Sequence, residues 1–174
     1  MTIAEFRQEL IDKRSYFYQF PGPATTYGHW TAGRHFTTFN DYHFNVDGDG
    51  EIIYTRPLDE VPKATWHRNT GSIAIALCCC YNARPNDLGE YPPTAAQIET
   101  LAKMFAVIAE VFDNPIDREH FMTHGEAAND DGYGLYSGEP DCRWDLEQLC
   151  DQDEIGTGGD ILRGKAQWYL ENGV

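Results

Sequence analysis

The sequence predicts a single α/β domain with a central mixed β-sheet flanked by helices. Three observations support this fold class. Predicted strands and helices alternate along the chain, residues 72–81 form a continuous apolar run of strand length, and residues 94–112 have a clear helical repeat. The 174 residues match the length of one ordinary domain, and the hydrophobic content of 41% excludes a disordered chain.

The first half of the chain predicts one helix and three short strands. Thr2 and Glu5 have the spacing of a capping box, and a Pro-Gly-Pro sequence follows the helix that they begin. Residues 24–30 form a short apolar and aromatic run that is typical of a strand. Residues 42–46 and 51–55 are two further strands, and the Asp-Gly-Asp-Gly turn between them predicts a hairpin.

The second half predicts a buried strand followed by the longest helix. Residues 72–81 suit a strand that is covered on both faces. Thr94 and Gln97 form a second capping box, and apolar residues follow at steps of three and four. The remaining predicted elements are a short strand at 121–123, a loop at 127–138, a short helix at 145–150 and a helix at 160–170.

Charge and cysteine content exclude several classes of protein. Lys and Arg number 13 against 28 Asp and Glu, so the net charge of −15 opposes binding to nucleic acid or to an anionic membrane. No apolar run reaches the roughly 20 residues of a membrane span. Three of the five cysteines are consecutive, which does not suit a disulfide framework and suggests a reducing compartment. The N-terminus shows no signal-peptide pattern, so we expect synthesis in the cytoplasm.

Two histidines have the placement of metal ligands. His29 and His124 each end a predicted strand, and Asp141 lies in the irregular segment after the second one. A catalytic zinc site commonly uses three such ligands and leaves one position open. The chain contains no HExxH or CxxC motif, so spacing alone leaves structural histidines as an equal alternative.

The order of the motifs resembles the zinc-dependent N-acetylmuramoyl-L-alanine amidase family, whose fold peptidoglycan recognition proteins share. The matching segments are Gly28–Gly33, Tyr42–Gly50, Trp66–Leu77, Thr94–Phe112, Thr123–Glu126 and Pro140–Leu146. The resemblance extends over about residues 26–149. It implies a zinc amidase domain at 21–150. The residues outside it are expected to form an N-terminal helical extension at 1–20 and a C-terminal tail at 151–174, which is either helical and packed on the domain or the start of a linker.

The resemblance also implies a set of metal ligands. It assigns Zn²⁺ to His29, His124 and Asp141. The family often has Pro-Gly after the third ligand, whereas Cys142 follows Asp141 here, so Cys142 is the alternative ligand. Asp141 is preferred because it keeps residues 144–146 aligned with the aromatic-Asp-apolar ending of the family motif.

Three further residues are candidates for catalysis by the same resemblance. Tyr42 matches the family's active-site tyrosine, and His67 matches a Trp-His position near the cleft. Glu139 falls where relatives often have lysine. A glutamate cannot offer a positive charge there, but it can accept a proton.

The function implied is zinc-dependent hydrolysis of the amide between N-acetylmuramic acid and L-alanine in peptidoglycan, by a monomeric phage or prophage endolysin that acts on the cell wall after release. Two alternatives remain open. One is a non-catalytic peptidoglycan-binding module of the same fold, and the other is a zinc amidase for another peptide or acyl-amide substrate.

Overall fold

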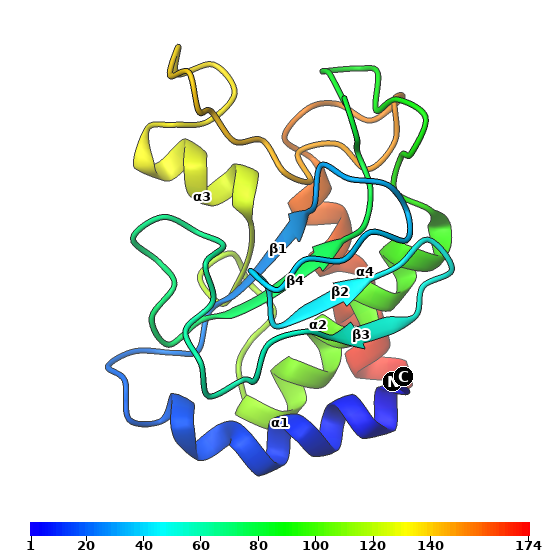
Figure 1. The fold of residues 1–174 in the computed structure, drawn as a ribbon. Coiled ribbons are helices and arrows are strands. Elements are labelled where there is room, and N and C mark those ends of the chain that lie inside the picture. Colours follow the sequence, from blue (N-terminus) through cyan, green and yellow to red (C-terminus); the bar gives the residue numbers. More distant parts are fainter.

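A five-stranded sheet forms the centre of the molecule in a computed structural model, which describes residues 1–174 (Figure 1). The strands are β1 (Thr26–Trp30), β2 (Phe44–Val46), β3 (Ile52–Tyr54), β4 (Ile73–Leu77) and β5 (Phe121–Thr123), in the spatial order β3-β2-β4-β1-β5. β3 pairs antiparallel with β2, and the other three pairings are parallel. The predicted α/β fold with a mixed sheet is therefore confirmed.

Four helices surround this sheet: α1 (Ile3–Phe17), α2 (Ala95–Phe112), α3 (His124–Asp131) and α4 (Gly158–Asn172). The capping boxes predicted from Thr2 and Thr94 are both present. Gly28 of β1 lies against Phe105 and Leu101 of α2, where an added Cβ would be 3.3 Å from the Phe105 ring. This close approach places α2 on one face of the sheet.

The two terminal helices belong to the same packed structure. In α1, the Phe6 ring is fully buried and meets the ring of Phe44 edge to face at 4.9 Å. α4 packs against α2 and β5, with Leu162 and Ala166 fully buried. The two chain ends lie close together (Figure 1). None of the helices has the length and apolarity needed to cross a membrane.

Three local predictions are wrong. Residues 127–138 were expected as a loop, but the first part belongs to α3, because Thr123 and Glu126 form a third capping box directly after β5. Residues 145–150 form turns rather than a helix. β4 ends at Leu77, so the buried cysteines Cys78–Cys80 follow the strand instead of lying within it.

Candidate metal centre

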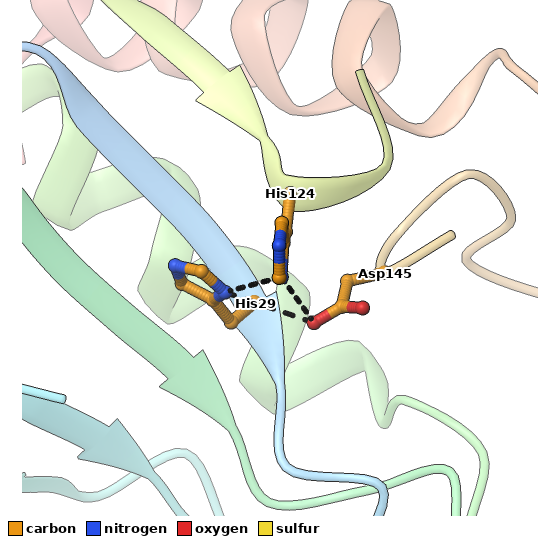
Figure 2. Close-up of side chains that lie close together, drawn as sticks. All are labelled: His29, His124 and Asp145. Atoms are coloured by element: carbon orange, nitrogen blue, oxygen red, sulfur yellow. Dashed lines mark hydrogen bonds and ion pairs between the residues drawn. The ribbon is translucent and has the colours of Figure 1, made fainter. Parts of the chain in front are cut away.

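Three side chains meet at the edge of the sheet where β1 and β5 end. The Nδ1 atoms of His29 and His124 are 3.2 Å apart, and Asp145 Oδ2 lies 3.7 Å from the first and 3.4 Å from the second (Figure 2). All three residues are buried, with exposed fractions of 0%, 6% and 4%. One oxygen and two nitrogen ligand atoms therefore converge on a single point.

The sheet determines where the two histidines lie. His29 follows Gly28 in β1, so its side chain points away from α2. Thr123 of β5 pairs with Gly28 in parallel register, and His124 comes next as the first residue of α3. The neighbouring strands thus end together and bring the two rings into contact.

Asp145 reaches the histidines through tertiary contacts of its own loop. The ring of Trp144 packs edge to face on Trp30, the residue after His29, with ring centroids 4.5 Å apart. The backbone carbonyl of Asp145 accepts a hydrogen bond of 3.1 Å from the N–H of Gly125, the residue after His124. The carboxylate is therefore fixed to the segments that carry both histidines.

A hydroxyl group meets the outer nitrogen of each imidazole ring. His29 Nε2 lies 3.3 Å from Thr65 Oγ1, and His124 Nε2 lies 3.3 Å from the Tyr133 hydroxyl. These contacts favour the tautomer in which Nε2–H donates to the hydroxyl oxygen and Nδ1 presents its lone pair to the centre. This is the arrangement that a metal-binding histidine requires.

Burial and charge set the protonation states of the cluster. Burial lowers the pKa of His29 to about 4, although Asp145 opposes this shift. Burial works to raise the pKa of Asp145, but the neighbouring His124 and His29 outweigh it and hold that pKa below its usual range. A neutral His29 and an ionised Asp145 at pH 7 are the forms that bind a metal ion.

The geometry fits a small tetrahedral cation. With ligand bonds of roughly 2.0–2.1 Å, two ligand atoms of tetrahedral zinc lie about 3.3–3.4 Å apart. The three separations of 3.2, 3.4 and 3.7 Å bracket this value. Two imidazole nitrogens and one carboxylate oxygen are also a ligand set that zinc accepts, with a fourth position free.

The carboxylate that lies beside the two histidines is not the one that the resemblance assigns. The structure brings His29 and His124 together as expected, but the carboxylate beside them belongs to Asp145, four residues after Asp141. Asp141 is exposed, and Cys142 is half-buried outside the cluster. The physical reason is that Arg143 donates its backbone N–H to Tyr133 O at 3.0 Å, which holds this part of the loop away from the buried centre.

A cleft of about 900 Å³ opens beside the centre, and His124 contributes to its wall. Glu139 and Asp141 line it together with two cationic side chains, Lys63 and Arg143. The cleft therefore connects one of the three clustered side chains with solvent, as a site for a large substrate would require.

The other predicted residues lie at different distances from the centre. The Tyr42 ring centroid is 5.1 Å from that of His29, and burial raises the pKa of the phenol, so Tyr42 remains a neutral O–H donor at pH 7. His67 is exposed and has a backbone φ of 59°, and its ring centroid lies 3.9 Å from that of Trp66. It is not among the residues that line the cleft.

An α/β domain with two buried histidines and an aspartate beside an open cleft has the arrangement of a metal-dependent hydrolase. Residues 17–134, about two-thirds of the chain, match the family model described as N-acetylmuramoyl-L-alanine amidase. The chain belongs to this family. The match covers His29 and His124 but ends before Asp141 and Asp145, so it does not bear on the carboxylate of the cluster.

The chain is also similar to a solved structure, the Ph2119 endolysin from Thermus scotoductus MAT2119 bacteriophage Ph2119. The TM-score is 0.49 and the sequence identity 17%, over 71% of this chain and 90% of that chain. No curated protein matches the sequence.

Proposed function

We propose that the protein hydrolyses the amide between N-acetylmuramic acid and L-alanine in peptidoglycan, with Zn²⁺ held by His29, His124 and Asp145. The observation that carries this proposal is the buried cluster of these three residues in a member of the amidase family. A bound zinc would polarise the substrate carbonyl and lower the pKa of a water molecule to about 7.

The residues around the centre have separate tasks in this reaction. Thr65 and Tyr133 orient the imidazole rings through their hydroxyl groups. Tyr42, next to His29, donates its O–H to the oxygen that gains negative charge in the transition state. Arg143 lies two residues before Asp145, which is where the family often has lysine, and its cationic side chain lines the cleft. Arg143 therefore supplies the positive charge that a glutamate at position 139 cannot offer.

Glu139 and His67 are proposed as proton carriers for the leaving amine. Glu139 suits this task because it lines the cleft, and its removal as Glu139→Gln is expected to lower kcat. His67 has the weaker support, since the structure gives it no contact with the cleft. If His67→Asn leaves the pH–rate profile unchanged, His67 has no catalytic task.

Mass spectrometry of peptidoglycan fragments tests the proposed reaction. Purified cell walls treated with the enzyme should release peptides that begin with a free L-alanine amine, and the turbidity of the wall suspension should fall. Binding to walls without release would instead indicate a peptidoglycan-binding module. Cleavage of other acyl amides, with intact walls, would indicate a different amidase substrate.

The endolysin role is tested in cells. Expression in the cytoplasm of a susceptible bacterium should leave the culture turbid until the membrane is permeabilised, for example with chloroform, and the culture should then clear. A culture that stays turbid after permeabilisation, although the purified enzyme cuts its walls, would contradict this role.

A further inference from the structure

We propose that Arg163 in α4 is a positioning residue for the metal centre, and that the start of α4 holds the two segments that carry His124 and Asp145. This inference rests on the proposed metal site. It assigns a task to a helix that lies outside the residues matched by the amidase family.

Arg163 forms a buried, two-pronged ion pair with Glu126 of α3. Its Nη2 lies 2.7 Å from Glu126 Oε1 and its Nη1 lies 2.9 Å from Oε2, and both side chains are only 10% exposed. A planar guanidinium that binds both oxygens fixes the orientation of the carboxylate as well as its charge. Asp160, one turn earlier in α4, orients the same guanidinium at 2.6 Å.

The ion pair holds the backbone on both sides of His124. Glu126 Oε2 accepts the N–H of Thr123 at 2.9 Å, and the Thr123 hydroxyl accepts the N–H of Glu126 at 3.0 Å, so this capping box encloses His124. Arg163 Nη1 also donates to the carbonyl of Phe121 at 2.8 Å. Arg163 thus contacts both the strand before His124 and the helix after it.

Two glycines at the start of α4 complete the connection. Gly158 donates its N–H to the carbonyl of Glu147 at 3.2 Å, two residues after Asp145. A Cβ at Gly158 would collide with the carbonyl oxygen of Leu146, and one at Gly159 would collide with the Glu126 carboxylate. The helix therefore approaches both ligand-bearing segments more closely than any residue with a side chain would permit.

A second ion pair on α4 provides a matched control. Lys165, two residues after Arg163, pairs with Glu99 of α2, and neither residue forms a hydrogen bond or ion pair with the segments around His124 or Asp145. Arg118 lies 3.7 Å from the Glu126 carboxylate, but it is half-exposed and remains in every variant. Loss of general stability and loss of positioning can therefore be separated.

The experiment compares Zn²⁺ affinity and stability in the full-length chain. The variants are Arg163→Met, Arg163→Lys and Lys165→Met. Competition with a chromogenic chelator gives the Kd for Zn²⁺, and urea denaturation of the metal-free protein gives the stability of each variant. We expect Arg163→Met to raise the Kd by roughly tenfold, the lower end of the effect of removing a group that is hydrogen-bonded directly to a metal ligand.

Arg163→Lys should restore part of the affinity, because it keeps the charge but not the two-pronged contact. Lys165→Met should change the Kd by less than about twofold. A Kd within about twofold of wild type in Arg163→Met would overturn the inference, as would an equal loss in Lys165→Met. If Arg163→Met does not fold, Arg163→Lys takes its place. A larger loss of Zn²⁺ affinity in Arg163→Lys than in Lys165→Met then supports the inference, and equal losses overturn it. Failure of the wild type to bind Zn²⁺ would refute the proposed function instead.

Discussion

Acid should destabilise the protein through His43, a buried histidine outside the metal centre. His43 Nδ1 accepts the backbone N–H of Ala74 at 3.1 Å, and His43 Nε2 lies 2.9 Å from the carbonyl of Glu60, to which it donates. The ring is fully buried. A proton added to Nδ1 would face the N–H of Ala74 and break that bond, so the folded protein holds His43 neutral.

The size of the effect follows from the pKa. Burial lowers the pKa of His43 from 6.5 to about 4, and the nearby charge of Arg56 contributes to the shift. Above pH 6.5 the ring is neutral in both the folded and the unfolded chain, so His43 causes no pH dependence. Between pH 6.5 and 4 only the unfolded chain binds the proton, and the free energy of unfolding should fall by about 3 kcal/mol in total. This is a large share of a typical stability of about 5–15 kcal/mol.

Urea denaturation at a series of pH values measures this effect. The protein is kept metal-free with a chelator, so that His29, which titrates in the same range, contributes equally to wild type and variant. His43→Asn retains an acceptor near the Nδ1 position but cannot take up the proton. The wild type should lose about 3 kcal/mol more than His43→Asn between pH 7 and pH 4. Parallel curves for the two proteins would refute the reasoning.

Two further predictions concern thiols and the support of the metal centre. Cys78–Cys80 are all buried, and burial raises the pKa of Cys78 to about 12. A thiol reagent should therefore modify only Cys142 and Cys150 in the folded protein, and all five thiols in urea. Rapid reaction of a third thiol in the folded protein would contradict the structure. Thr65→Val removes the hydroxyl beside Nε2 of His29 and, if the proposed zinc site is correct, should weaken Zn²⁺ binding by roughly tenfold in chelator competition. Thr70→Val, at an exposed position, is the matched control, and an equal loss in both variants would exclude the orienting role.

Local patterns in the sequence were sufficient for most of the fold. The continuous apolar run of β4 and the capping box and periodicity of α2 depend on residues close in sequence, so their structure could be predicted. The same reasoning applied to Thr123 and Glu126 would have identified α3, because these residues have the spacing of a capping box. The prediction of a loop at 127–138 did not take this capping box into account.

The third side chain of the metal centre depends on contacts between distant residues. Asp141 and Asp145 are both acidic residues of one irregular segment, and the alignment with the family motif favoured Asp141. Packing of Trp144 on Trp30 and the hydrogen bond from Gly125 select Asp145. The role proposed for Arg163 also depends on a contact between distant residues, since its partner Glu126 lies 37 positions earlier in the chain.

The zinc content of two aspartate variants tests the central claim most directly. Wild type, Asp145→Ala and Asp141→Ala are purified without chelator, loaded with Zn²⁺, dialysed and analysed for metal, and the folding of each is checked by near-UV circular dichroism. We predict about one zinc per chain in wild type and in Asp141→Ala, and loss of the metal in folded Asp145→Ala. Retention of zinc by Asp145→Ala together with its loss from Asp141→Ala would contradict the proposed metal centre.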